Sequence, residues 1–145
     1  MTNYMKLEIS AISENEAFAR SAVAAFALAL NPSISELSDV KTAVSEAVTN
    51  CIVHAYGKQD ADEKVTIECW TEKMEKGGKL HITVSDSGKG IADVKRAVEP
   101  FFTTLEGDER SGMGFTIMQT FMSEFSLQSE EGKGTTVRMT KEIGA

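Results

Sequence analysis

Glu46 and Asn50 lie four residues apart in a stretch with helical spacing, so they project together from one side of a helix. The carbonyl oxygen of an asparagine is a hard ligand that suits magnesium, which takes most of its other ligands from phosphates and water. A carboxylate one turn away could accept the proton of a group that attacks a terminal phosphate. The pair therefore indicates phosphoryl chemistry.

Asp86 follows an alternating apolar segment and is itself followed by Gly88 and Gly90. An ionised aspartate is a pure acceptor and can receive an amino hydrogen from a purine. Glycines lack a side chain, so the backbone beside them can pass close to a flat base. This segment indicates the base end of a nucleotide site.

Gly112 and Gly114 open a later helix, and Gly134-Thr135-Thr136 enters the last strand. The free N–H groups and positive dipole end of a helix favour phosphate. Arg110, just ahead of that helix, is a mobile cation for the outer phosphates. Each group alone is common, because glycine pairs occur in many turns and a helical Glu and Asn usually face solvent. Their order and spacing together predict the site.

The elements that must hold these residues follow from periodicity and from helix caps. Ser33 and Glu36 have capping-box spacing and open a helix that reaches about Tyr56 and stops at Gly57. This helix carries Glu46 and Asn50. Ser13 and Glu16 have the same spacing and predict an earlier, alanine-rich helix to about Leu30, which can pack on the core and also on a partner.

Strands are expected around residues 7–9, in a hairpin of residues 65–70 and 80–85, and in a closing hairpin of residues 126–129 and 135–141. His81 is expected to be only a surface position. A short helix over 93–98 leads into a polar loop at about 100–113, which we expect to be a lid because long loops without structure are uncommon. Helical spacing resumes over 114–125.

The composition limits what the chain can be. It has 145 residues, with 41% hydrophobic and 26% charged residues, and favours one domain spanning 1–145. A net charge of −7 argues against direct binding to nucleic acid or to an anionic membrane. Cys51 and Cys69 have no metal-site spacing and suit a reducing compartment, and no segment approaches the length of a membrane span, so we expect a cytoplasmic protein.

Taken together, the motifs resemble the N, G1, lid, G2 and G3 boxes of the ATPase superfamily that gyrase, Hsp90, histidine kinases and MutL share. Within it the chain is most similar to the bacterial anti-sigma factors that are also serine protein kinases, in particular those of sporulation that act on sigma F. The matching segments cover essentially the whole chain in order: 45–54, 86–90, 102–104, 110–118 and 134–136.

The resemblance implies a two-layer α/β sandwich of the Bergerat type, with helices on one face of a mixed, mostly antiparallel sheet. It implies that Glu46 is the catalytic base, that Asn50 ligates Mg²⁺, and that Asp86 binds the adenine of ATP or ADP with help from Thr135. The other residues matched to nucleotide binding are Gly88, Gly90, Thr104, Arg110, Ser111, Gly112, Met113 and Gly114.

The resemblance also implies a homodimer that holds a sigma factor away from RNA polymerase and phosphorylates a serine of an anti-anti-sigma protein. Arg20, near the start of the alanine-rich helix, is the candidate partner contact. The chain departs from the family pattern at Ala92, where proline is frequent, and at Leu105, where a lysine is frequent. The second departure removes a lid cation and gives Arg110 more weight.

Other interpretations stay open at this point. The chain could be a nucleotide-gated binding module without kinase activity, in which ATP only orders the lid and a partner surface. A histidine-kinase catalytic domain is disfavoured, since no phosphoacceptor helix pair precedes the first strand. His54 and Cys51 supply too few ligands for structural zinc.

Overall fold

The computed structural model describes residues 2–91 and 113–144. They form a five-stranded sheet in the order β1-β2-β3-β5-β4 with helices packed against it. The strands are β1 (Tyr4–Ala11), β2 (Asp60–Lys73), β3 (Gly78–Asp86), β4 (Glu124–Glu130) and β5 (Gly134–Ile143). The helices are α1 (Glu14–Ala27) with a 3₁₀ turn (Leu28–Leu30), α2 (Ile34–Asn50) with a π-helical turn (Cys51–Ala55), and α4 (Gly114–Phe121).

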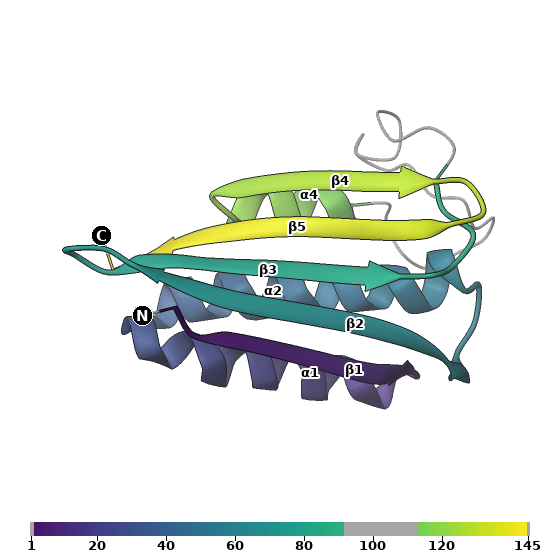
Figure 1. Cartoon of the computed structure of the whole chain (residues 1–145), viewed down its shortest axis with the longest axis horizontal. Coiled ribbons are helices and arrows are strands. Elements are labelled where there is room, and N and C mark those ends of the chain that lie inside the picture. The colour runs from purple at the N-terminus through teal and green to yellow at the C-terminus, as the bar shows by residue number, and fades with distance from the viewer. Residues whose placement is uncertain (1, 92–112, 145) are drawn as a thin grey trace.

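In the described part of the chain, the helices lie on one face of the sheet, and no helix or strand covers the other face (Figure 1). On β3 the side chains of Leu80, Ile82 and Val84 are fully buried beneath the helices, whereas His81 and Thr83 alternate with them on the uncovered face. The predicted α/β sandwich is confirmed. All four strand pairings in the described residues are antiparallel, so the parallel pairing that a mixed sheet contains is not found among them.

The two predicted capping boxes have different outcomes. At α2 the box forms: Ser33 Oγ accepts from the N–H of Glu36 at 3.0 Å, and Glu36 Oε1 accepts from the N–H of Ser33 at 2.8 Å. At α1 the prediction is wrong, because Ser13 has helical dihedral angles and makes no side-chain cap. Glu16 instead pairs with Arg20 one turn later at 2.7 Å, and the Ser13 N–H donates to Gln59 at 2.7 Å.

The helix expected over 114–125 is shorter than predicted. It ends at Phe121, and Phe125 belongs to β4, where it alternates with exposed neighbours and packs on the core. At the end of α2, Gly57 has the left-handed φ of +76° that the sequence predicted. The short helix expected over 93–98 and the lid at about 100–113 lie outside the described residues, as do Ala92 and Leu105.

One lysine joins three elements at the end of the sheet away from Asp86. Lys141 of β5 donates to Asp39 Oδ2 of α2 at 3.0 Å and to the carbonyl oxygen of Phe121, the last residue of α4, at 2.6 Å. The ammonium is mostly buried, with 14% of the side chain exposed. It therefore sets the position of α4 relative to α2.

Candidate nucleotide site

The start of α4 lies directly against the two side chains of α2 that the sequence singled out, Glu46 and Asn50. A Cβ atom placed on Gly114 would lie 3.1 Å from Asn50 Nδ2 and 3.2 Å from Glu46 Oε2. Both side chains are partly buried, and the helix core stripe behind them, which includes Val44 and Val48, is fully buried. The structure thus brings Gly114 against Glu46 and Asn50, which precede it in the sequence by more than sixty residues.

Asp86 ends β3, and its carboxylate is held by donors from three parts of the chain. Its Oδ1 accepts from the N–H of Gly88 at 2.9 Å, and the carboxylate also accepts from the Thr135 backbone N–H and the Cys51 thiol. Burial raises the pKa of Asp86 above its ordinary value, while the three donors act in the opposite direction. The result is an oriented, partly desolvated acceptor.

The Cys51 thiol is a site residue that sequence reasoning missed, since it treated the cysteine as core filling only. Cys51 is buried, with 4% of its surface exposed, and burial raises its pKa well above the ordinary value, so the sulfur keeps its proton. A protonated thiol can donate to Asp86. No local signal in the sequence indicates this contact, because the two residues are brought together only by the packing of α2 on β3.

The segment after Asp86 is fixed to the end of α2. The N–H of Lys89 donates to the carbonyl oxygen of Ala55 at 3.1 Å, and a Cβ on Gly88 would lie 2.5 Å from that oxygen. The N–H of Ser87 donates to the Tyr56 hydroxyl at 2.9 Å. The absence of a side chain at Gly88 therefore allows the chain to pass close to the backbone of Ala55. The sequence had suggested only that this glycine lets the backbone approach a nucleotide base.

Gly90 and Thr135 are linked through the turn between β4 and β5. Gly90 has a φ of +75°, and a Cβ there would overlap the carbonyl oxygen of Glu130. Thr135 is buried, and its hydroxyl lies 2.8 Å from Ser129 Oγ, which also accepts from the N–H of Ile91 at 2.7 Å. Ser129, which sequence reasoning did not single out, thus connects the two predicted nucleotide segments.

The remaining predicted residues fall in different places. Met113 is partly buried and immediately precedes α4. Arg20 lies on α1, and besides Glu16 its Nη1 contacts Ser45 Oγ at 3.4 Å, next to Glu46 in the chain. Thr104, Arg110, Ser111 and Gly112 lie outside the described residues.

Candidate metal ligands are few. In residues 2–91 and 113–144, no three or more His, Cys, Asp or Glu side chains gather into a group that could hold a metal ion. A Cβ atom placed on Gly114 would lie 3.3 Å from Asn50 Oδ1 and 3.2 Å from Glu46 Oε2, so both side chains present hard oxygen donors, of the kind that magnesium uses with phosphate, to the start of α4. No helix in the described part of the chain is long and apolar enough to cross a membrane.

Residues 9–141 match the family model described as the histidine kinase-like ATPase domain. The chain belongs to this family. As a histidine kinase-like ATPase domain, it matches three proteins named anti-sigma F factor over nearly their full lengths, which confirms the resemblance that the motifs indicated.

The protein from Thermoanaerobacter sp. (strain X514) is 53% identical over 144 residues, covering 99% of this chain and 96% of the relative. That from Caldanaerobacter subterraneus subsp. tengcongensis is 54% identical over 142 residues, covering 98% and 95%. That from Clostridium botulinum (strain Eklund 17B / Type B) is 51% identical over 142 residues, covering 97% and 95%.

Solved structures show that the histidine kinase-like ATPase fold is shared across distant sequences. The RsbU and RsbW domains of Rv1364c from Mycobacterium tuberculosis superpose with a TM-score of 0.66 at 15% identity, covering 97% of this chain and 32% of that one. The catalytic domain of the histidine kinase ThkA gives a TM-score of 0.54 at 16% identity, covering 97% and 98%.

Proposed function

We propose that this chain is a cytoplasmic anti-sigma factor and serine protein kinase, with residues 1–145 forming one domain. It binds a sigma factor so that the factor cannot engage RNA polymerase, and it uses ATP to phosphorylate a serine of an anti-anti-sigma protein. The relatives named anti-sigma F factor support the first role. The meeting of Glu46 and Asn50 at Gly114 is the observation that carries the second.

The nucleotide would lie between Asp86 at one end and the start of α4 at the other. The carboxylate oxygens of Asp86 would accept a hydrogen bond from the adenine amino group, and the Thr135 side chain would assist beside them. The backbone N–H groups of Met113 and Gly114, at the start of α4, would bind the phosphates, and Gly112, which lies outside the described residues, is assigned to the same role. We assign Thr104, Arg110 and Ser111 to the lid that closes over them.

Asn50 Oδ1 fits a magnesium ligand, because it is an uncharged oxygen donor at the phosphate end of the site. Magnesium bound there would neutralise phosphate charge. Glu46 would take the proton of the substrate serine as the serine oxygen bonds to the γ-phosphorus. The bond from that phosphorus to the bridging oxygen breaks, and ADP leaves.

The decisive experiment measures transfer and binding together. Wild type, Glu46→Gln and Glu75→Gln, an exposed carboxylate in the turn between β2 and β3 that serves as the matched control, are incubated with labelled ATP and the anti-anti-sigma protein. We expect Glu46→Gln to lower phosphoserine formation by at least about 100-fold with nucleotide still bound, and Glu75→Gln to keep wild-type transfer. Retained transfer in Glu46→Gln would refute the base assignment.

A binding module without kinase activity would give a different result in this experiment. If the wild-type protein forms its complex with the anti-anti-sigma protein and Mg-ATP but yields no phosphoserine, the chain is a nucleotide-gated binding module. Gel filtration with the sigma factor, with and without Mg-ATP, then measures how nucleotide controls that complex.

The surface of α1 is the proposed contact for the sigma factor. Arg20 lies on this helix, Phe18 of α1 is 53% exposed, and Leu28 of the 3₁₀ turn that follows is 57% exposed. Exposed large apolar side chains occur at surfaces that bind other proteins. We propose that the chain works as a homodimer that presents this helix to its partner.

A further inference from the structure

Three polar side chains lie side by side across the face of the sheet that the helices cover. Thr135 of β5 pairs with Asp86 of β3 on one side and with Ser129 of β4 on the other. Cross-strand partners have Cβ atoms about 5 Å apart, so the three side chains can interact directly. We call them the polar row. The next row on the same face belongs to the apolar core: Val84, Val137 and Leu127.

The hydroxyl of Ser129 has three partners, and two of them have fixed roles. The N–H of Ile91 can only donate, and its nitrogen lies 2.7 Å from Ser129 Oγ. The carbonyl oxygen of Gly134 can only accept, and it lies 3.0 Å from the same atom. Because a hydroxyl has one hydrogen, Ser129 gives that hydrogen to Gly134.

The third partner of Ser129 is the Thr135 hydroxyl, whose oxygen lies 2.8 Å from Ser129 Oγ. Ser129 has no second hydrogen to give, so all three bonds form together only if Thr135 donates. Thr135 is buried, and buried hydroxyl groups are almost always hydrogen-bonded. The hydrogen of Thr135 is therefore directed at Ser129, and Thr135 Oγ1 keeps only lone pairs for any other partner.

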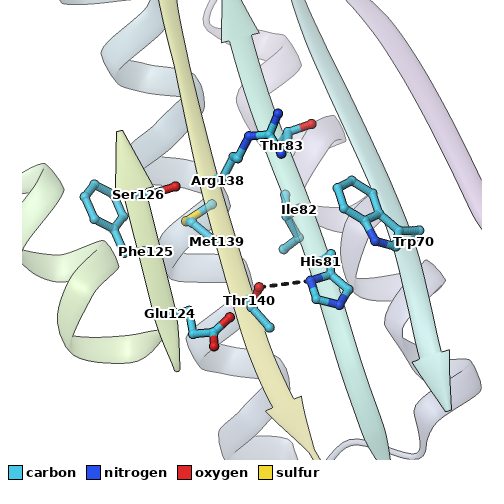
Figure 2. A pocket seen from close by; sticks show the side chains of 10 residues that line it. All are labelled: Trp70, His81, Ile82, Thr83, Glu124, Phe125, Ser126, Arg138, Met139 and Thr140. Carbon is cyan, nitrogen blue, oxygen red and sulfur yellow. Dashed lines mark hydrogen bonds between the residues drawn. The ribbon is translucent and has the colours of Figure 1, made fainter. Parts of the chain in front are cut away.

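Thr140, another buried threonine of β5, lies on the opposite face of the sheet and bonds to an imidazole. Its Oγ1 lies 3.0 Å from His81 Nδ1, and the direction of that bond depends on which ring nitrogen carries hydrogen (Figure 2). His81 stacks on Trp70 and its side chain is only 22% exposed, so the expectation that it is only a surface position is incomplete. The fixed direction at Thr135 thus comes from its partner Ser129 and is not general to threonines of this strand.

Asp86, at the other end of the polar row, is also an acceptor. Its carboxylate accepts from the backbone N–H groups of Thr135 and Gly88. When ionised it has no hydrogen to donate. Asp86 and the Thr135 hydroxyl therefore both present lone pairs, and a ligand that binds them must bring the hydrogens.

Purine bases differ in what they offer such a row of acceptors. The 6-amino group of adenine donates hydrogens, whereas the 6-oxo group of guanine or hypoxanthine only accepts. An amino group finds partners on the row, while an oxo group leaves lone pairs facing lone pairs. Sites of this kind discriminate strongly, because the wrong ligand leaves desolvated polar groups unpaired.

We propose that Ser129 sets the base specificity of the nucleotide site by directing the hydrogen of the Thr135 hydroxyl away from the base. This inference rests on the proposed function, which places the base at Asp86. Ser129 is a positioning residue that acts through Thr135. Without the Ser129 hydroxyl, the Thr135 hydroxyl is free to turn and donate to a 6-oxo group, so the site accepts 6-oxopurines more readily.

The test compares the affinities for ADP and for inosine 5′-diphosphate, which carries the 6-oxo base hypoxanthine on the same ribose and phosphates. Titration calorimetry is run on the full-length wild type and on Ser129→Ala. We expect the wild type to prefer ADP, and this preference to fall by about 3- to 10-fold in Ser129→Ala, the effect of one hydrogen bond. A site that is merely loosened would lose affinity for both nucleotides and keep their ratio.

Three further variants show whether Ser129 acts through Thr135. Ser123→Ala is the matched control, because Ser123 Oγ also accepts a backbone N–H, that of Glu142 at 2.9 Å, but precedes β4 at the end away from Thr135. It should keep the wild-type ratio. Ser129→Thr retains a hydroxyl and should keep that ratio too. In a Thr135→Val background, which has no hydroxyl to turn, Ser129→Ala should leave the ratio unchanged.

An unchanged ratio in Ser129→Ala, or an equal fall with and without the Thr135 hydroxyl, would overturn the role of Ser129. Ser129→Val, whose β-branched side chain suits a strand, replaces Ser129→Ala if that variant does not fold. A wild type that binds neither nucleotide would refute the nucleotide site of the proposed function, and this specificity with it. A wild type that prefers ADP but forms no phosphoserine would refute the kinase step alone.

Discussion

At the scale of single residues, Asp86 concentrates most of what the site must do at its base end. In the proposed site the ionised carboxylate, which only accepts hydrogen bonds, receives the adenine amino group, yet it is partly buried and its pKa is raised for that reason. The N–H groups of Gly88 and Thr135 and the thiol of Cys51 oppose the rise. The acceptor is therefore sensitive to acid.

Nucleotide affinity should fall as the solution is acidified, beginning at a higher pH than an ordinary aspartate would allow. The sign follows from the raised pKa, because protonation turns the acceptor into a donor while the adenine amino group still needs an acceptor. Titration calorimetry with ADP at a series of pH values measures this. Asp86→Asn keeps an acceptor that does not titrate, so its weaker binding should vary less with pH; an identical profile in both proteins would exclude Asp86 as the titrating group.

The two buried thiols offer a matched comparison. Cys51→Ala removes a donor to Asp86, and we expect nucleotide affinity to fall by about 3- to 10-fold, which corresponds to one hydrogen bond. Cys69→Ala removes a thiol that is equally buried, with a pKa raised to about 12, but lies in β2 away from the site. Its affinity should match wild type. Equal losses of affinity in the two variants would show that packing, and not the thiol donor, is responsible.

At the scale of elements, the two capping-box sequences show which local signals survive tertiary contacts. Ser33 caps α2 as its spacing predicts, and the pKa of Glu36 is lowered first by its bond to the Ser33 backbone. Ser13 has the same spacing but makes no side-chain cap, because its dihedral angles are helical, and the Glu16 carboxylate pairs with Arg20. The spacing of serine and glutamate alone therefore does not decide whether a capping box forms.

Substitution at the two caps should therefore have unequal effects on stability. Ser33→Ala should lower the free energy of unfolding by about 1 kcal/mol, since it removes a formed cap from the helix that carries Glu46 and Asn50. Ser13→Ala should change it by less than about 0.5 kcal/mol. Urea denaturation followed by circular dichroism measures both, and equal losses would mean that Ser13 caps α1 in solution.

The periodicity of apolar residues predicted helices and strands well where the pattern fits only one of the two. The hairpin of β2 and β3 and the long helix α2 were recognised because alternation and helical spacing are each sustained over several residues. The end of α4 was missed because Phe125 is apolar in either pattern and only the pairing of β4 with β5 decides. For the site, the glycines and Asp86 were visible in the sequence, whereas the contact of Cys51 with Asp86 depends on packing between elements.

At the scale of the whole molecule, α1 connects the partner surface to the site. Arg20 reaches Ser45 Oγ at 3.4 Å, and Ser45 precedes Glu46 on α2. A partner that engages Arg20 would therefore act on a side chain already in contact with the functional helix. The proposed sigma-factor surface and the nucleotide site are thus neighbours.

Reversal of the charge at Arg20 tests whether α1 carries the partner contact. Arg20→Glu should weaken binding of the sigma factor at least about ten-fold, or about 1.4 kcal/mol, while nucleotide affinity stays at the wild-type value. Surface plasmon resonance and calorimetry measure the two. Lys41→Glu makes the same charge change at an exposed position of α2 and serves as the control; a parallel loss of both affinities in Arg20→Glu would indicate misfolding.

The hydrogen bond from Lys141 to the last residue of α4 affects the position of the other end of this helix, where we propose that phosphate binds. Lys141 binds Phe121, the last residue of α4, and the eight residues of this helix span about 12 Å, so Gly114 at its other end, against Glu46 and Asn50, lies about 12 Å away. A rotation of about 10° at the held end would displace the other end by about 2 Å, more than the tolerance of a hydrogen bond. Loss of the charge of this mostly buried amine would remove its ion pair with Asp39, so Lys141, remote from the proposed nucleotide site, contributes to the alignment of Gly114 with Glu46 and Asn50.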